Sequence, residues 1–452
     1  MSFYLHEMHG LFLCLINLRG PMSSKESHEE DQRSYRRHFN QWRYPLSLNC
    51  HLCISEVIDR FTQIEKKKGL RWRERKRRDL WILRHTIEAL VCDLAHHHLS
   101  GHSNGIAISR SNRDLKKKSR YKNPYITGQL PYIMDVLELP ELQIVEQVKG
   151  GLNLFETEHK GNFKTVMRPG VQLVQFVQKY QIEYEDIGLG DCDETIILKS
   201  KKSGFWDESE IIEYEDNDQT NHYRKEMTEI NQWIKEAELN YLMPVNSNTD
   251  VDLSERRLRR YFTRGSFESG GRLFGGFWQE LKKEQRKNII IDDEEAVSLD
   301  YSQMAPRILY GVCGKRPTTE DCYRIPGYER YRSGIKKVIN AMTFAKNPMT
   351  RFPKSVKKMF NEDIRFQQIS DAIHRYHSSI AHKFYVGIGH HLQYLESQIL
   401  IKVLLGLKNL GIHALPIHDA VVVGKAWVDM STQLMEQVFL DMTNVESWVQ
   451  VE

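Results

Sequence analysis

The stretch Ala296-Val-Ser-Leu-Asp300-Tyr-Ser-Gln-Met-Ala-Pro-Arg307 joins a short strand pattern to the start of a helix. Its first residues alternate as in a half-buried strand, and after Ser302 the apolar spacing becomes helical. The pattern predicts a buried strand that ends at Asp300. A carboxylate there is well placed to hold a metal ion, although an Asp at this position can also cap the following helix. Other segments must decide between these two roles.

The chain has 452 residues, 40% hydrophobic and 27% charged, enough for a sizeable core and two or three domains. Its formal charge is only +4, yet basic residues gather in Lys66–Lys68, Arg71–Arg78 and Lys116–Lys122. These runs predict a positive field over the N-terminal part, although each run alone also fits a solvated helix face. Seven scattered cysteines form no disulfide framework, which favours a reducing, cytoplasmic location.

The spacing of Cys50 and Cys53 is that of a CxxC motif, and Cys92 with His96 could complete a zinc site. The latter two lie in an apolar helical run, so buried thiols are the favoured interpretation. The apolar patch at residues 11–18 is too short to span a bilayer, and no membrane association is expected.

Changes in composition divide the chain into five segments. They are a disordered segment or extension at 1–42, a helical N-terminal domain at 43–124, a winged-helix-like module at 125–206, an acidic linker at 207–222 and a domain that carries the chemistry at 223–452. The winged-helix-like interpretation rests on a helix at 169–177 followed by a strand at 194–199.

Paired glycines flank Arg272 in the segment 269–278, downstream of a basic helix start predicted at 254–262. Such glycines indicate close approach of the backbone to another group while the guanidinium points at it. Two turns around a surface arginine remain the alternative.

Four polar or aromatic residues, Arg332, Lys336, Asn340 and Phe344, are spaced four apart and share one helix face. Two cations, an amide and an aromatic ring in a column suit a triphosphate with a base stacked at its end. A solvated basic stripe gives the same pattern.

The segment 414–423 predicts a hairpin with His418 and Asp419 at its tip. Beside the strand that ends at Asp300, this tip would bring two carboxylates within reach of shared divalent ions, as two-metal phosphoryl transfer requires. Seen alone, the tip is also an ordinary polar turn.

In this order the segments resemble the palm and fingers of family A DNA polymerases, a superfamily that includes the phage-type single-subunit RNA polymerases. The run Asp300 to Gln303 followed by Arg307 resembles the first palm motif, and His418-Asp419 resembles the third. Arg332 and Lys336 resemble the Arg-x3-Lys of the fingers helix. The resemblance covers residues 250–430.

Two further matches concern nucleic acid. Gly271-Arg272-Leu273 and the later Arg286 resemble the family's residues that face the primer-template. Glu396 to Gln398 lies where the family has a Gln-containing helix near the catalytic centre.

The resemblance implies an α+β fold with a right-hand polymerase palm and fingers in the C-terminal half, preceded by helical and winged-helix-like modules. It implies a template-directed nucleotidyltransferase in which Asp300 and Asp419 hold two Mg²⁺ ions, with Mn²⁺ as the alternative, and His418 orients the primer end. The implied nucleotide-binding residues are Arg332, Lys336, Asn340, Phe344, Tyr301 and Ala305, and those for nucleic acid are Arg272, Arg286 and Gln398.

The implied partners are primer-template DNA or RNA and nucleoside triphosphates, with replication partners bound through the N-terminal domain and a mobile element as the source. Ala305 departs from the family, whose DNA polymerases have a Glu there that excludes a ribose 2′-hydroxyl. The smaller residue favours a primase-polymerase that tolerates ribonucleotides. Ala420 likewise replaces a Glu, as in the phage-type RNA polymerases.

A different class of function also fits, namely a non-catalytic DNA-binding replication or regulatory protein on a decayed polymerase scaffold. Retention of both carboxylates and both fingers cations favours catalysis, because a binding module has no use for them. A reverse transcriptase or a template-independent nucleotidyltransferase is a third class, and the lack of a YxDD-type hairpin disfavours the first of these.

Overall fold

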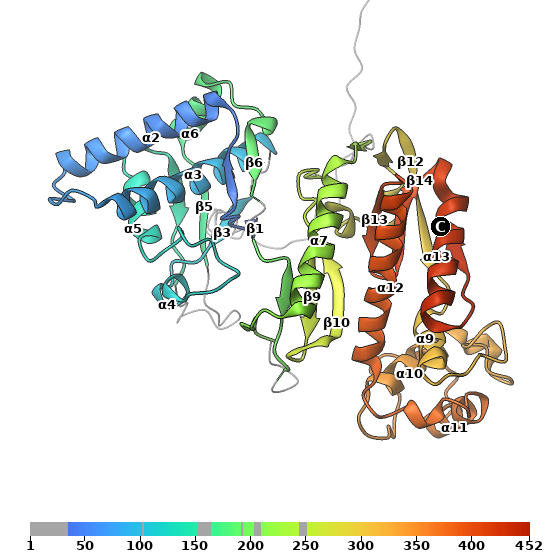
Figure 1. Ribbon diagram of the computed structural model, residues 1–452. Helices are drawn as coiled ribbons and strands as arrows, with labels where there is room; N and C mark the ends of the chain where they lie inside the picture. Colours follow the sequence, from blue (N-terminus) through green and yellow to red (C-terminus); the bar gives the residue numbers. More distant parts are fainter. Residues whose placement is uncertain (1–34, 102–103, 152–163, 191–192, 203–208, 244–250) are drawn as a thin grey trace, which may run out of the picture. The chain divides into compact units, whose positions relative to one another are not determined.

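A computed structural model describes residues 35–101, 104–151, 164–190, 193–202, 209–243 and 251–452. The chain has mixed α and β structure and divides into two compact units, unit 1 at Met1–Asp193 and unit 2 at Glu194–Glu452 (Figure 1). Within the described residues, no helix combines the length and the apolar character needed to cross a membrane.

Unit 1 contains a four-stranded mixed sheet with the order β1-β3-β5-β4. Its strands are β1 (Tyr35–His38), β3 (Gly105–Ile108), β5 (Thr165–Pro169) and β4 (Val145–Val148). Only the β1–β3 pairing is parallel. A separate antiparallel pair joins β2 (Arg43–Pro45) to β6 (Ile187–Leu189).

Helices supply most of the apolar core of unit 1. They are α2 (Leu48–Lys67), α3 (Arg77–Leu99), α5 (Leu130–Leu137) and α6 (Val171–Lys179). The short helix α4 (Asn112–Lys116) has no buried residue. The long helix α3 is central, because it is buried over most of its length and contacts α2, α5, α6 and the sheet. Cys50, Cys53 and Cys92 are buried free thiols in this core, as expected for core cysteines.

The predicted disordered segment 1–42 needs correction at its end. Residues 1–34 lie outside the described part of the chain, but β1 begins at Tyr35 and pairs with β3. Asp93, a fully buried carboxylate of α3, holds β1 and the residues after it. Arg37 Nη2 and Arg43 Nε lie 2.8 and 3.1 Å from its Oδ1. These ion pairs, invisible in the local sequence, order the segment.

The predicted boundary at 124/125 also needs correction, because α2, α3, α5 and α6 bury their apolar faces in one common core. The predicted winged-helix-like module does not assemble either. Its last strand, β7 (Ile196–Leu198), belongs to unit 2, where it pairs in parallel with β9 (Arg259–Thr263) and buries all three of its side chains.

The central sheet of unit 2 is built around β12 (Glu294–Tyr301). One edge of β12 pairs with β14 (Ala420–Gly424), which continues to β13 (Ala414–Ile417). The other edge pairs first with β11 (Ile289–Ile291), which leads to β8 (Leu239–Tyr241), and then with β15 (Val449–Val451). All pairings are antiparallel, and the strand ending near Asp300 is confirmed.

A second sheet, β10-β9-β7, includes β10 (Ser266–Phe274). The basic helix start predicted at 254–262 is wrong: residues 254–258 form no helix, and β9 begins at Arg259 and alternates buried with partly exposed residues. Arg260 is fully buried; Nε donates to Gly271 O, Nη2 to Ser397 Oγ and Nη1 to Glu226 Oε2 at 3.1, 3.1 and 3.2 Å.

The helices of unit 2 begin with α7 (Asp218–Glu236), which is capped by reciprocal bonds between Asn217 and Thr220. The predicted linker at 207–222 therefore ends five residues too late. The remaining helices are α8 (Lys283–Arg286), α9 (Met304–Val312), α10 (Arg332–Phe344), α11 (Phe366–Tyr376), α12 (Gly389–Asn409) and α13 (Val428–Thr443).

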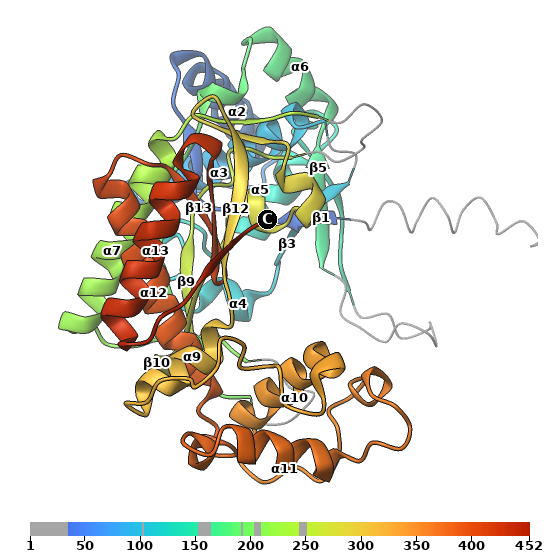
Figure 2. The ribbon, with the colours of Figure 1, turned by 90° about the vertical axis from the view of Figure 1, so that its right-hand side faces the viewer.

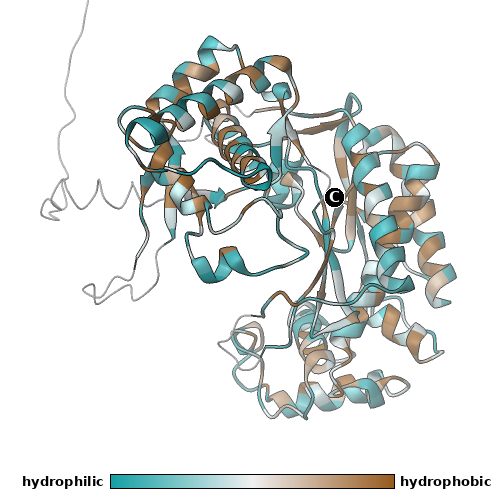
Figure 3. Cartoon of the chain, turned by 60° about the vertical axis from the view of Figure 1, so that its left-hand side comes forward, coloured by the Kyte–Doolittle hydropathy of each residue, from teal (hydrophilic) through white to brown (hydrophobic). Residues whose placement is uncertain are grey.

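Helix α12 connects the parts of unit 2, because it contacts β10, α7, α9, α10 and α13. Figure 2 places α10 and α11 together at one end of the unit, below the strands. The helices of unit 2 carry both hydrophilic and hydrophobic residues (Figure 3). Their buried hydrophobic residues form one large core together with those of β12.

The predicted close approach at the paired glycines is real, but its partner is the protein itself. Gly271 has φ +85°, and a Cβ there would lie 2.5 Å from Ser397 Oγ on α12. The glycine therefore lets β10 pack directly on α12.

Gly271→Ala is expected to lower the free energy of unfolding by about 2–4 kcal/mol, through steric overlap and a left-handed backbone. Urea titration measures this. Gly314→Ala is the matched control: its φ is +62° with no atom near the new Cβ, so it should cost about 1 kcal/mol. Gly271→Ala should cost less in a Ser397→Ala background than in wild type, because the overlap with Ser397 Oγ is gone, although Ser397→Ala itself loses the bond from Arg260. Equal losses in the two glycine variants would contradict the assignment.

Candidate active site

The pairing of β12 with β14 brings two predicted carboxylates to one place. Asp300 is the register partner of Ala420, and Asp419 directly precedes Ala420 in the two-residue turn between β13 and β14. The hairpin predicted at 414–423 is thus confirmed, together with its position beside the strand that carries Asp300.

Asp300 lies in an environment that disfavours its charge. Burial, with contributions from the carboxylates of Asp419 and Glu452, raises its pKa to about 6, against the opposing effect of Lys336 and Lys283. The Oδ1 atom is buried and has no hydrogen-bond partner among the described residues. A helix-capping role leaves this atom unexplained, because a capping carboxylate accepts a bond from the helix backbone.

This donor set suits a hard divalent cation. Mg²⁺ is typically held by one or two protein carboxylates, with the other positions filled by substrate phosphates and water. Asp300 and Asp419 supply two such carboxylates, and an unpartnered oxygen is available. Within the described ranges there is no group of three or more His, Cys, Asp or Glu side chains arranged to hold a metal.

A third carboxylate, Glu396 on α12, was not predicted as a site residue. Its side chain is 6% exposed and pairs with Arg272, whose Nη2 and Nε lie 2.6 and 2.8 Å from Glu396 Oε1. Burial raises the pKa of Glu396 to about 7; Arg272 opposes the rise, whereas Asp419 and Asp300 add to it. The sequence places Glu396 among the polar residues in the first turns of this helix, but its spacing does not indicate Arg272 as a partner.

His418 occupies the first position of the hairpin turn with φ +57°. Its ring meets that of Phe274 edge-on with 5.8 Å between centroids. Burial lowers the pKa of His418, and the cations of Arg272 and Arg286 lower it further, although Asp419 opposes them. The imidazole is therefore held neutral next to the carboxylates.

The two cations of α10 stand on one side of the site. Arg332 Nε donates to Asp321 Oδ2 at 2.6 Å, and Lys336 is exposed. Both cations lie over the ring of Tyr323, at 5.5 and 5.9 Å from its centroid. Neither Asp321 nor Tyr323 was predicted, because both lie in an irregular loop without a recognisable spacing.

The two remaining residues of the column predicted on α10 lie in different environments. Asn340 is exposed on the same helix, whereas Phe344 packs edge-on against His390 with 4.9 Å between ring centroids. Phe344 also covers Gly389, where a Cβ would lie 2.7 Å from the ring. The aromatic end of the column is therefore occupied by a contact with the start of α12.

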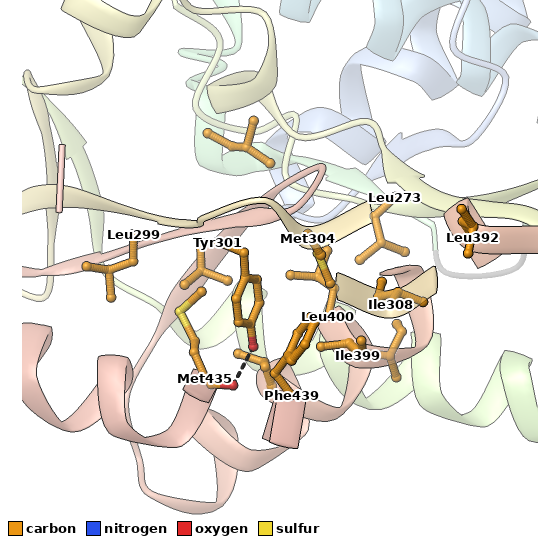
Figure 4. Close-up of a cluster of buried hydrophobic side chains, with 14 of the residues drawn as sticks. Leu273, Leu299, Tyr301, Met304, Ile308, Leu392, Ile399, Leu400, Met435 and Phe439 are labelled. Carbon is orange, nitrogen blue, oxygen red and sulfur yellow. Dashed lines mark hydrogen bonds between the residues drawn. The ribbon is translucent and has the colours of Figure 1, made fainter. Parts of the chain in front are cut away.

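Tyr301 is misplaced by the prediction. It is 4% exposed, and its hydroxyl donates to Met435 O at 2.6 Å inside the apolar cluster that Figure 4 shows. Because side chains alternate along a strand, Tyr301 faces away from Asp300. The predicted contact of Tyr301 with a nucleotide is therefore wrong, because its ring is part of the core.

Three other predicted residues take different positions. Gln398 directs its amide to the hydroxyls of Tyr394 and Tyr223 at 2.7 and 3.3 Å, and the two-residue step from Glu396 puts it on another face of α12. Arg286 Nε donates to Trp278 O at 3.2 Å, while its charge still reaches His418. Ala305 lies partly exposed in the first turn of α9.

Comparisons with known proteins add little. No protein-family model and no curated protein matches the chain. One similar solved structure is the POL domain of Pol1 from M. smegmatis in complex with DNA primer-template and dNTP, with 10% identity and a TM-score of 0.29. The match covers 52% of this chain and half the length of that polymerase chain. A TM-score of this size establishes no common fold, so the reaction must be inferred from the residues of the site.

Asp300→Asn is expected to stabilise the protein at pH 8 in EDTA by about 1–2 kcal/mol, because the carboxyl is only partly buried and solvent screens part of the effect. The pKa of the folded-state carboxyl is about 6, above its usual value of 3.8, so ionisation costs stability as pH rises through this interval. The advantage of the variant should therefore fade as pH drops from 8 to 4. Urea titrations across this range measure it.

Asp293→Asn serves as the control, because it removes the same charge from an exposed turn of the same sheet. If the Asp300→Asn variant is less stable than wild type at pH 8, the raised pKa of Asp300 is contradicted.

Proposed function

We propose that unit 2 is a template-directed nucleotidyltransferase that extends a primer with nucleoside triphosphates. The observation that carries this proposal is the meeting of Asp300 and Asp419 at the β12–β14 pairing, with a buried Asp300 oxygen that no described residue hydrogen-bonds. Two adjacent carboxylates repel one another unless a cation lies between them, and a reaction on phosphates requires such cations.

Asp300 and Asp419 would hold Mg²⁺, with Mn²⁺ as the alternative. When bound, the metal neutralises phosphate charge and acidifies the attacking hydroxyl. Because the pKa of Asp300 is about 6, protons compete for this carboxylate below neutral pH. Activity is therefore expected to fall as pH drops through this value.

Arg332 and Lys336 would bind the triphosphate. Arg332 is already held by Asp321, so a phosphate oxygen arriving at its guanidinium exchanges one anion for another. Lys336 is exposed and acts electrostatically on Asp300, which supports a position between the incoming phosphates and the carboxylates. Tyr323 stacks beneath both cations and limits their movement.

Arg272 and His418 would contact the primer end. Glu396 fixes the Arg272 guanidinium through one carboxylate oxygen, which leaves donors of the planar group available to nucleic acid. His418 is uncharged, so it can share a hydrogen bond with a primer hydroxyl without adding positive charge. Glu396 is a positioning residue in this scheme.

Primer extension tests the proposal. Wild-type protein should extend a labelled primer on a template when Mg²⁺ and nucleoside triphosphates are present, and Asp300→Asn or Asp419→Asn should lower the rate by at least about 1,000-fold, as expected for loss of a metal-holding carboxylate. Asp293→Asn, a matched charge removal at an exposed turn, should extend at the wild-type rate.

Extension by wild type no faster than by Asp300→Asn would reject the enzymatic proposal. If wild type does not extend the primer but all variants still bind primer-template, the alternative of a non-catalytic DNA-binding protein is favoured.

Ala305 bears on the sugar of the incoming nucleotide. We infer from its methyl side chain, partly exposed in the first turn of α9, that a ribose 2′-hydroxyl is tolerated and that the enzyme acts as a primase-polymerase. This inference rests on the resemblance to family A DNA polymerases, in which a Glu at this position excludes the hydroxyl.

Ala305→Glu should therefore raise the preference for deoxyribonucleotides over ribonucleotides by at least about 10-fold, which corresponds to about 1.4 kcal/mol of discrimination. Single-turnover incorporation of each nucleotide measures this ratio. Ala305→Ser is the small control and should leave the ratio near that of wild type. Strong rejection of ribonucleotides by the wild-type protein would contradict the inference.

A further inference from the structure

The loop between α2 and α3 and the helix ends beside it concentrate positive charge in unit 1. Residues 66–78 include nine basic side chains and one acidic one. Arg75 is held by buried Glu65, and Lys68 lies 2.7 Å from Glu141. Within the described residues, the other seven form no ion pair. They are Lys66, Lys67, Arg71, Arg73, Lys76, Arg77 and Arg78.

The start of α3 adds to this positive field. Arg77 and Arg78 occupy its first turn, where the helix dipole disfavours cations. Asp79 in the same turn offsets part of this charge, so the positive field comes from the excess of basic side chains over residues 66–79. The N-cap, Lys76, provides no side-chain hydrogen bond to the free backbone N–H groups. Charge repulsion and unsatisfied donors would both be relieved by an anion. The excess of basic side chains around this helix start suits an anionic partner.

Large aromatic side chains stand among these cations. Trp72 is 83% exposed, and its ring lies 4.2 Å from the guanidinium carbon of Arg73. Trp81, one turn into α3, is 51% exposed. An indole left in water forgoes a large part of the free energy that its burial would supply.

Trp81 is also held in place from behind. Its ring packs on His85 with 5.0 Å between centroids, and His85 packs on Tyr125 at 4.2 Å. These contacts on one side limit the movement of Trp81, while about half of its side chain stays exposed. A rigid aromatic plate is a better stacking surface than a freely rotating ring, because less conformational entropy is lost on binding.

We propose that the segment 66–81 binds single-stranded nucleic acid, with bases stacked on Trp72 and Trp81 and phosphates paired with the seven basic side chains. Aromatic plates interleaved with cations fit a flexible strand whose bases are exposed, whereas the bases of a duplex are already stacked. The proposal stands on unit 1 alone and does not depend on the reaction proposed for unit 2.

Binding of a labelled oligothymidylate of about 15 nucleotides to the full chain tests this, in EDTA and without nucleotides. Trp72→Ala should weaken binding by at least about 5-fold, and Trp72→Phe should restore most of it, because stacking needs a ring. The triple variant Arg71→Gln, Arg73→Gln, Arg77→Gln should reduce the slope of log affinity against log salt by about 2.

Val171→Ala is the matched control, since Val171 is also an exposed apolar residue of unit 1, 64% exposed. Each variant is measured again in an Arg272→Ala background, so that binding by unit 2 does not hide the effect.

Equal affinity of Trp72→Ala and wild type in both backgrounds would overturn the proposal. Trp72-dependent binding to phosphatidylserine vesicles with no oligonucleotide binding would overturn it in favour of a lipid surface. Loss of primer extension with intact oligonucleotide binding would reject only the reaction proposed for unit 2.

Discussion

The register between β12 and β14 is the constraint on which the site depends. Five consecutive pairs, from Ala296 with Gly424 to Asp300 with Ala420, fix which residue ends beside the hairpin turn. Because side chains alternate, a slip of one residue would send Asp300 into the apolar core and bring Tyr301 out. Burial of Leu299 and Tyr301 against α13 and α12 makes that slip costly, so packing on one face determines the chemistry on the other.

The site also balances charges that would not coexist in a simple core. Burial raises the pKa values of Asp300 and Glu396; the charge of Asp419 adds to both rises, and that of Asp300 adds to the rise at Glu396. Arg272 compensates from β10. Its placement relies on Arg260, a fully buried cation that bonds both to β10 and to Ser397 one residue beyond Glu396. The carboxylates are thus held by an arrangement of cations on a neighbouring sheet.

Elements with a strong local pattern could be predicted. The strand that ends near Asp300, the helix α10 and the hairpin around His418 follow from alternation, periodicity and turn residues within short windows. The Glu396–Arg272 pair could not, because its partners are 124 residues apart and nothing in either segment refers to the other. The burial of Tyr301 was available in the sequence, since a residue next to Asp300 on a strand must face the opposite side. The strands of unit 1 were missed because contacts such as those of Asp93 override the local polarity.

The hydrogen bond from Tyr301 to Met435 ties the strand that carries Asp300 to α13, and it uses a backbone carbonyl as the acceptor. The tyrosine side chain is therefore required, while the side chain at 435 contributes only apolar volume. Among homologous chains, the aromatic hydroxyl next to the aspartate should persist, whereas α13 is free to change its sequence as long as it stays helical at that turn. A residue that looks like part of a catalytic signature would then be retained for mechanical support.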